Sequence, residues 1–170
     1  MELQPAAAPL VLLALMASAA LPACGYQLAS TYRVRGGAEH LHVRVFENDS
    51  TDPELGAIVT AALREELASR GAWGGPEASA VLEGWVRSSQ SVPSTYGAAL
   101  FGMSVELHGR LSVGGKQVEE LTVQRQADHL GGADPLEAEG RRTVALRKLA
   151  REAARELLRA LETEAGAPKQ

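Results

Sequence analysis

Two histidines, His40 and His42, are the first residues whose type and spacing could do chemistry. In an extended strand, side chains two residues apart lie on the same face, about 7 Å from each other. Such a pair could supply two imidazole ligands to zinc, but a zinc site needs further ligands. The sequence has no HExxH motif and no second closely spaced histidine pair. We therefore interpret the two histidines as part of a polar strand face and predict no metal site.

Two other patterns match chemical motifs only in part. Ser104 lies in the segment GMSVE, which begins like a nucleophile elbow but ends in Glu where the second Gly belongs. Glu47, Asp49 and Asp52 lack the glycine and the distal glutamate of a calcium loop, so we interpret this acidic cluster as capping the following helix. Because no nucleophile–base set or phosphate loop is present, we predict that the chain is not an enzyme and uses no cofactor.

Four arginines at four-residue spacing form a stripe near the C-terminus: Arg147, Arg151, Arg155 and Arg159. Segment 135–161 has seven basic and four acidic residues, a net charge of +3, whereas the rest of the chain after residue 23 carries −6. Guanidinium groups bind phosphates bidentately, so the stripe could bind phosphate. However, Glu152 and Glu156 precede Arg155 and Arg159 by three residues, a spacing typical of helical ion pairs. We therefore favour a solvated helix face.

Residues 92–102 are a candidate contact segment that contains Tyr96, Leu100 and Phe101. If this segment is a loop, its exposed aromatic and leucine side chains indicate a partner-binding surface. If the flanking strands extend into a longer hairpin, the same residues belong to the sheet, and both interpretations stay open. Basic residues on the predicted strands and turns are alternative phosphate contacts. These are Arg87, Arg110, Lys116 and Arg125.

The composition excludes several classes of protein. A length of 170 residues predicts one domain with a core of its own. The net charge of −4, with only two Trp, three Tyr and two Phe, argues against nucleic-acid binding. A single cysteine excludes an intramolecular disulfide and any metal site that needs several cysteines.

That cysteine, Cys24, follows an apolar run at residues 9–21. The run is too short to span a bilayer, which needs about 20 residues, but it suits a secretory signal. The sequence Leu-Pro-Ala-Cys at residues 21–24 resembles a bacterial lipobox, in which the cysteine becomes the lipidated first residue, although the preceding segment has no Lys or Arg. We predict a signal peptide over residues 1–23, a covalent lipid on Cys24 and attachment to a membrane through that lipid.

Hydrophobic periodicity predicts the elements that position these residues. Apolar residues alternate at period two in residues 40–46, 80–87, 103–113 and 118–126, which indicates four strands. In the first strand Leu41, Val43 and Val45 share a face, and a bulge is expected near Glu119 and Glu120.

Two helices are predicted from apolar stripes and caps. One follows Asp52-Pro53, and the other spans residues 135–161 after the cap Asp134, with a stripe that includes Leu136 and Val144. The order β-α-β-β-β-α predicts a parallel first strand pair followed by an antiparallel meander. The predicted fold is α+β: a two-layer sandwich of a four-stranded mixed sheet with both helices on one face. It covers residues 40–163, between a lipidated tether (24–39) and a tail (164–170).

Four segments of the chain resemble the lipopolysaccharide-assembly lipoprotein family, LptE. They are CGYQL at 24–28, VRVFEN at 43–48, LREELASRG at 63–71 and AVLEGWV at 80–86. The resemblance covers about residues 24–160 and departs from the family at Gln27, where histidine is common. It implies the same sandwich fold, a lipid anchor in the outer membrane facing the periplasm, and partnership with the β-barrel translocon LptD. Family members sit inside that barrel as a plug and can bind lipopolysaccharide.

The resemblance leads to one principal hypothesis and one alternative. The principal hypothesis is an outer-membrane lipoprotein that plugs and helps assemble the lipopolysaccharide translocon, with Tyr96, Leu100 and Phe101 as partner contacts. The family's lipopolysaccharide-binding positions do not align with basic residues here, so Arg87, Lys116 and Arg125 are this sequence's own candidates for that contact. The alternative is an activator of a periplasmic cell-wall synthase, which would need a longer linker than residues 25–39 provide.

Overall fold

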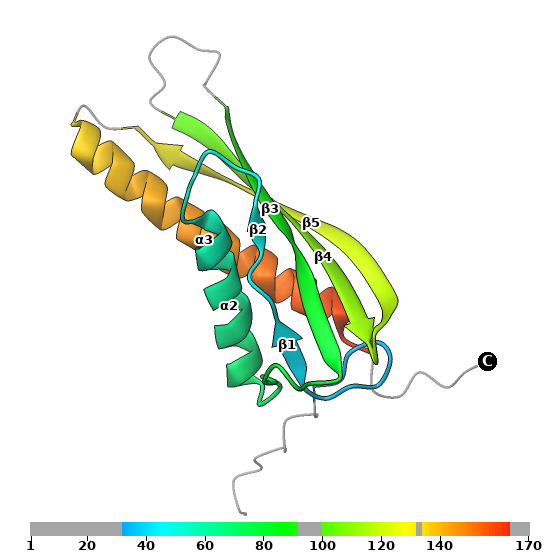
Figure 1. Cartoon of the computed structure of the whole chain (residues 1–170). Helices are drawn as coiled ribbons and strands as arrows, with labels where there is room; N and C mark the ends of the chain where they lie inside the picture. Colours follow the sequence, from blue (N-terminus) through cyan, green and yellow to red (C-terminus); the bar gives the residue numbers. More distant parts are fainter. Residues whose placement is uncertain (1–31, 92–99, 132–133, 164–170) are drawn as a thin grey trace, which may run out of the picture. The chain divides into compact units, whose positions relative to one another are not determined.

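The computed structural model describes residues 32–91, 100–131 and 134–163. Two helices and five strands make up this part of the chain (Figure 1). The strands are β1 (Leu41–Val43), β2 (Glu47–Asn48), β3 (Ala80–Ser91), β4 (Leu100–Val113) and β5 (Lys116–Leu130), and the helices are α2 (Leu55–Ser69) and α3 (Pro135–Leu161).

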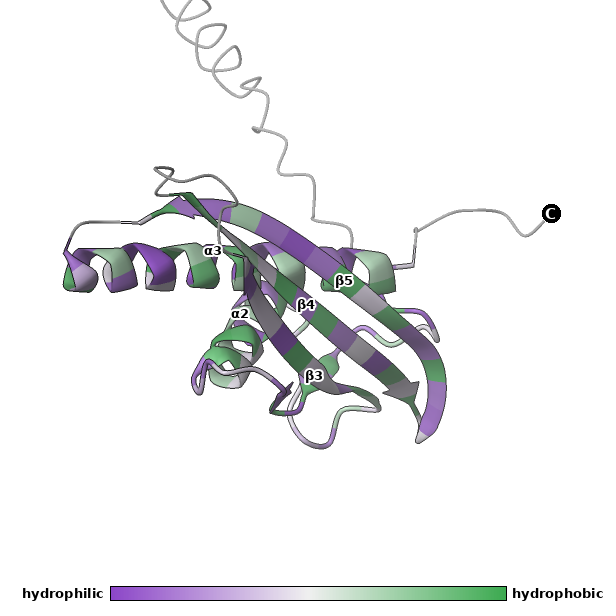
Figure 2. Ribbon diagram, turned by 90° about the horizontal axis from the view of Figure 1, so that it is seen from above, coloured by the Kyte–Doolittle hydropathy of each residue, from purple (hydrophilic) through white to green (hydrophobic). Residues whose placement is uncertain are grey.

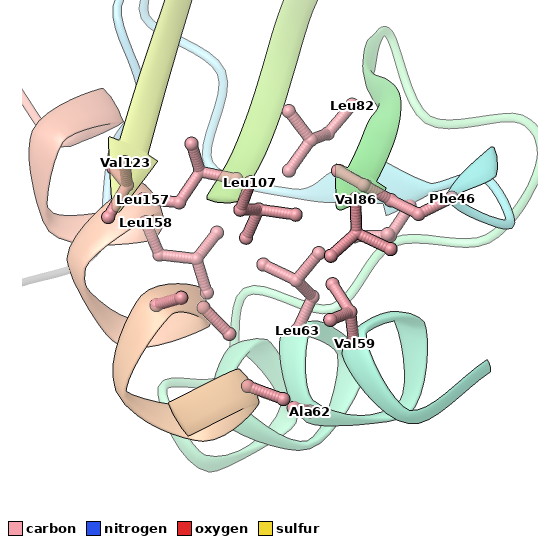
Figure 3. Packing of buried hydrophobic residues seen from close by; sticks show 14 of the residues in the cluster. Phe46, Val59, Ala62, Leu63, Leu82, Val86, Leu107, Val123, Leu157 and Leu158 are labelled. Atoms are coloured by element: carbon pink, nitrogen blue, oxygen red, sulfur yellow. The ribbon is translucent and has the colours of Figure 1, made fainter. Parts of the chain in front are cut away.

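The sheet has the predicted mixed topology, with strand order β1-β3-β4-β5. β1 and β2 both pair with β3 in parallel, whereas β3–β4 and β4–β5 are antiparallel. Both helices pack on one face of this sheet. Figure 3 shows Leu107 and Val123 from the strands directed towards Leu63 of α2 and Leu157 of α3. The predicted α+β architecture is therefore confirmed.

The first strand differs from its prediction because it contains an extra residue. Leu41 pairs with Ala80 but Glu47 pairs with Trp85, so the edge formed by β1 and β2 is one residue longer than the facing part of β3. A one-residue insertion flips the side chains that follow it to the other face. Val45, predicted to be buried, is consequently 69% exposed, and Phe46 (2%) takes its place in the core.

Gly84 leaves the space that the Phe46 ring occupies. A Cβ atom at Gly84 would lie 2.9 Å from Phe46 Cε1 and 1.9 Å from the carbonyl oxygen of His108. The Phe46 amide also donates to Thr60 Oγ1 on α2 at 2.9 Å. A residue without a side chain at position 84 is therefore a steric requirement of this packing.

The hairpin strands are longer than predicted. The strand predicted to end at residue 87 continues through residues 88–91 and pairs with β4 as far as Ser91. The hydroxyl groups of Ser89 and Ser104 lie 2.7 Å apart across the two strands. A polar segment such as this one can therefore form a strand when its side chains lie on an exposed sheet face. The predicted bulge occurs one residue early, because Val118 is the residue of β5 left without a partner on β4.

The two helix starts differ in how well they were predicted. Asp134 caps α3 as expected, accepting a hydrogen bond from the Leu136 amide at 2.9 Å. The cap predicted for α2 is wrong: the helix begins after Glu54, without a side-chain cap. The carboxylate of Asp52 instead forms an ion pair with Arg142 of α3, so it joins α3 to the turn before α2.

α3 is buried only along its C-terminal part, from Leu146 onward. Leu136 and Val144, which the sequence placed in the apolar stripe, are 85% and 68% exposed. Figure 1 shows the reason: the N-terminal turns of α3 extend past α2, alongside the outer ends of β4 and β5.

Part of the predicted tether belongs to the domain. Tyr32 and Val34 are buried in the core, and the Tyr32 hydroxyl donates to the carbonyl oxygen of Leu158 at 2.9 Å. Val34 also forms a β-bridge with Glu162, just after α3. Residues 32–39 are therefore packed against the sandwich and do not form a spacer.

Candidate functional site

The face of β3, β4 and β5 opposite the helices is the candidate site, and we call it the open face. Alternate side chains of each strand point to it, and Figure 2 shows hydrophilic and hydrophobic residues alternating along these strands. Its central side chains are Glu83, Trp85, Arg87 and Ser89 of β3, Ser104, Glu106, His108 and Arg110 of β4, and Glu120, Thr122, Gln124 and Gln126 of β5. Neither of the two described helices packs against this face.

A ladder of alternating charges crosses the half of the open face nearest the β4–β5 turn. Glu83 lies 2.9 Å from Arg44 and 3.8 Å from Arg110, and Arg110 lies 3.9 Å from Glu120. The imidazole Nε2 of His108 lies 2.9 Å from the same Glu120. The hydrogen bond from Gln117, followed by the charges of Arg110 and His108, lowers the pKa of Glu120. The ladder therefore neutralises its own charges.

Arg87, Trp85 and His108 form a stack beside the ladder. The rings of Trp85 and His108 are 5.1 Å apart and almost parallel, at 3°. The Arg87 guanidinium lies 5.2 Å from the centre of the indole and is hydrogen-bonded to Asp49, which raises the pKa of Arg87. Contacts with neighbouring side chains therefore fix the positions of Trp85 and of Arg87, the arginine predicted to contact phosphate.

The other half of the open face carries no basic side chain within the described strands. Serine and glutamine side chains line a shallow hollow of about 330 Å³: Ser89, Ser91, Ser104, Gln124 and Gln126. Beyond the hollow, Leu100 and Leu130 pair across β4 and β5, and both are exposed. Asp128 also lines the hollow and is exposed, so this half is a polar surface with one carboxylate that ends in two leucines.

The structure describes two of the three residues predicted to contact a partner and places them on opposite faces of β4. Leu100 and Phe101 lie in β4, so the sheet interpretation of these two residues is the one observed. Leu100 belongs to the open face, whereas Phe101 is in phase with the buried Met103 and stacks on His129 at 5.5 Å. Tyr96 lies outside the described residues.

The three predicted lipopolysaccharide contacts are also far from one another. Arg87 is on the open face, Arg125 is on the helix side of β5 with an ion pair to Glu156 of α3, and Lys116 starts β5 at the turn. Lys116 has no ion pair within the described ranges. No shared site for the three residues follows from their positions.

Residues of the two candidate motifs contact other parts of the fold. Ser104 is hydrogen-bonded to Ser89, and His42 contacts Gly74 and Trp73. His42 Nδ1 lies 3.3 Å from the Gly74 carbonyl oxygen, and its ring faces Trp73 at 6.1 Å. Among the residues that the structure describes, no group of three His, Cys, Asp or Glu side chains is arranged to hold a metal ion.

No helix within 32–91, 100–131 or 134–163 is long and apolar enough to cross a membrane.

The ion pairs predicted along α3 are not the ones observed. Glu152 lies 3.9 Å from Lys148, and Glu156 pairs with Arg125 of β5. Arg155 lies 3.2 Å from Glu66 of α2. Within the described parts of the chain, Arg147, Arg151 and Arg159 have no carboxylate within 4 Å.

Sequence reasoning missed the Trp85–His108 stack and the charge ladder. Each depends on which residues of neighbouring strands face each other, and a single strand's periodicity does not contain that register. The signal present in the sequence was the phase of His108 and Arg110 with Glu106, which places all three on one face.

Comparison with known proteins identifies the family of this sandwich. The sequence profile of LptE, described as lipopolysaccharide assembly, matches residues 38–161. The chain belongs to the LptE family. No curated protein is significantly similar to the sequence.

Two solved lipoprotein structures have a fold similar to that of this chain. Rare lipoprotein B from Shewanella oneidensis has 18% sequence identity and a TM-score of 0.50, covering 68% of this chain and 91% of its own. An uncharacterized lipoprotein B from Nitrosomonas europaea has 11% identity and a TM-score of 0.51, covering 71% and 80%. At these identities the likeness shows the fold alone.

Proposed function

We propose that this chain is a lipoprotein that docks into a β-barrel lipopolysaccharide translocon of the LptD type through its open face. A lipid on Cys24 anchors it to the outer membrane on the periplasmic side. Membership of a lipopolysaccharide-assembly family supports this role and agrees with the expectation that the chain is not an enzyme.

The open face is the observation that carries the proposal. The interior of a transmembrane β-barrel is polar, so a protein that occupies it should present hydrogen-bonding rather than apolar side chains. The open face offers serine, threonine and glutamine side chains over much of its area, and its charged half is internally neutralised. Among the described side chains of this face, the carboxylates of Glu106 and Asp128 have no ion-pair partner, so docking against a polar wall requires hydrogen bonds to these two groups.

The exposed leucines at the end of the hairpin supply the apolar part of this contact. Leu100 and Leu130 are adjacent across β4 and β5 and continue the open face. Phe101 supports this end from the helix side, by stacking on His129. We include Tyr96 in the same contact because it lies four residues before Leu100 in the sequence.

Direct lipopolysaccharide contact is the finer part of the proposal. Lys116, Arg87 and Arg125 are the proposed phosphate contacts, at three separate places. Lys116 is the strongest candidate, because Arg87 is paired with Asp49 and Arg125 with Glu156.

Co-purification tests the docking. The tagged, lipidated chain would be recovered from detergent-solubilised outer membranes beside two matched variants, Gln124→Trp on the open face and Lys148→Trp on α3. Both positions are exposed. We expect one large β-barrel protein at equal stoichiometry with the wild type and Lys148→Trp, and loss of most of it with Gln124→Trp.

Two results would overturn the proposal. One is recovery of a cell-wall synthase, which would support the alternative activator role. The other is equal barrel recovery with both variants, which would remove the open face from the contact. Cys24→Ala reports separately on the anchor, because its loss should move the chain out of the membrane fraction.

A further inference from the structure

The outer side of α3 carries basic side chains that the rest of the described structure leaves unpaired. Arg147, Arg151 and Arg159 have no carboxylate partner in residues 32–91, 100–131 or 134–163. The two glutamates that the spacing assigned to this stripe are engaged elsewhere, Glu152 with Lys148 and Glu156 with Arg125. The stripe is therefore a solvated helix face, as predicted, but without the two ion pairs that its spacing suggested.

Two of these arginines line a groove between the helices. Arg147 and Arg151 flank a hollow of about 230 Å³ whose floor includes Ile58, Ala61 and Ala62 of α2. It continues into a second hollow of about 280 Å³, beside Arg155. Two carboxylates line the groove, those of Glu65 and Glu66, and Glu66 is hydrogen-bonded to Arg70 and Arg155.

An exposed apolar side chain lies next to the arginines. Val144, 68% exposed, precedes Arg147 by three residues and Lys148 by four, so all three are neighbours on the helix surface. The apolar stripe of α3 is buried in the core, so attraction of basic side chains to anionic lipids is the main contribution here, at about 1 kcal/mol for each Lys or Arg near the surface. We call this surface, made of Val144, Arg147, Lys148 and Arg151, the α3 basic face.

We propose that the α3 basic face binds the headgroups of anionic phospholipids at a membrane surface. Charge complementarity identifies the occupant. The chain as a whole carries −4, so general attraction to an anionic membrane is absent, whereas segment 135–161 carries +3. The guanidinium groups would engage lipid phosphates bidentately, and Val144 would enter the boundary between headgroups and acyl chains.

The proposal uses the lipid anchor on Cys24 only to bring the chain to the membrane. Docking of the open face into a barrel is a separate claim about the opposite side of the sheet. The two claims can therefore fail independently.

A fluorescence experiment tests the proposal on the lipidated full chain. Because Cys24 is the only cysteine and its thiol is the predicted lipidation site, a Val144→Cys variant has one free thiol for an environment-sensitive label. A Gln124→Cys variant on the open face is the matched control. Each would be reconstituted in vesicles of phosphatidylcholine alone and of phosphatidylcholine with phosphatidylglycerol.

We expect the label at position 144 to shift to an apolar environment only when phosphatidylglycerol is present, and the shift to disappear at 1 M salt. Each arginine near the surface contributes roughly a five-fold preference for the docked state, so Arg147→Gln with Arg151→Gln should reduce docking about 25-fold. Arg33→Gln with Arg35→Gln removes the same charge from exposed ion pairs elsewhere and should leave membrane docking unchanged.

Two outcomes would overturn the proposal. They are no shift at position 144 and an equal shift in neutral vesicles. Failure of the chain to float with neutral vesicles would reject the anchor instead. That result is read from flotation and is distinct from the label.

Discussion

The open face and the α3 basic face both contain arginines, but in the described part of the chain these are paired with carboxylates on the open face and unpaired on the α3 basic face. On the open face and its edge, Arg44, Arg87 and Arg110 each lie within 4 Å of a carboxylate. On α3, Arg147 and Arg151 lie beside a groove without such a partner in the described structure.

The difference follows from the geometry of sheets and helices. On the sheet, the register places Glu83 and Glu120 on either side of Arg110, within 4 Å of it. Arg87 pairs with Asp49 and not with Glu106, its cross-strand neighbour. Helical neighbours three and four residues apart can also turn towards other elements, as Glu156 turns to Arg125 of β5. The arginines of the sheet therefore each have a carboxylate nearby, whereas the helix keeps positive charge available for a ligand.

The largest expected effect is a loss of unfolding free energy from a substitution on the helix side of the sheet, compared with one on the open face. Leu157 of α3 is fully buried and packs near Gly109 of β4. Leu157→Ala should lower the free energy of unfolding by about 2–5 kcal/mol, because it leaves a cavity. Thr122→Ala on the open face should change it by less than about 0.5 kcal/mol. Urea unfolding measures both, and similar losses would show that the open face also carries the fold.

A second prediction compares a shielded ion pair with the exposed ladder. Asp52 and Arg142 join α3 to the turn before α2 and are 14% and 24% exposed. Removing one partner leaves a poorly solvated charge, so Asp52→Ala should destabilise by about 2 kcal/mol, between surface and buried pairs. Double-mutant cycles with Arg142→Gln measure the coupling. A coupling near zero would contradict this assignment.

A third prediction is that the stability of the fold depends on pH through Tyr32, which tests whether the N-terminal segment is packed in the core. Burial raises the pKa of Tyr32, an effect opposed by the charge of Arg70 and increased by that of Glu162. Above the ordinary tyrosine pKa of about 10, the unfolded chain ionises and the folded chain does not, so stability should fall as pH rises further.

Tyr32→Phe should cost about 1 kcal/mol at neutral pH, through the lost hydrogen bond to Leu158. It should also remove Tyr32's share of the decline above pH 10. Unfolding curves between pH 8 and 11 would show this. An identical decline in the variant would place Tyr32 outside the core.

The smallest effect should come from the ladder itself. Glu83→Gln breaks contacts with Arg44 and Arg110, whose side chains are largely in water. Exposed pairs contribute up to about 1 kcal/mol, so the thermal midpoint should move little. The variant instead leaves Arg44 without its partner at the edge of the open face and leaves Arg110 with Glu120 alone. If such pairs make that face fit for docking, barrel recovery should fall although the fold is intact.

Sequence reasoning predicted what local periodicity and caps determine. The bounds of α3, its cap at Asp134 and the meander of β3, β4 and β5 follow from such signals. The exchange of Val45 for Phe46 could not be predicted, because it depends on one extra residue opposite β3. The position of Asp52 depends on Arg142, 90 residues away.

The candidate site was predictable in composition but not in arrangement. The polar phase of β4 and β5 was visible in the sequence, and so was the arginine stripe of α3. Which arginines are paired depends on packing between elements: Arg125 reaches Glu156, and this leaves Arg159 without the partner that its spacing predicted.

Site-specific photocrosslinking in cells tests the central claim most directly. A photoreactive residue would replace Gln126 on the open face in one strain and Lys148 on α3 in another, since both side chains are exposed. We predict an adduct with one large outer-membrane β-barrel protein from position 126 and none from position 148. A barrel adduct from position 148 alone, or equal adducts from both, would contradict docking through the open face.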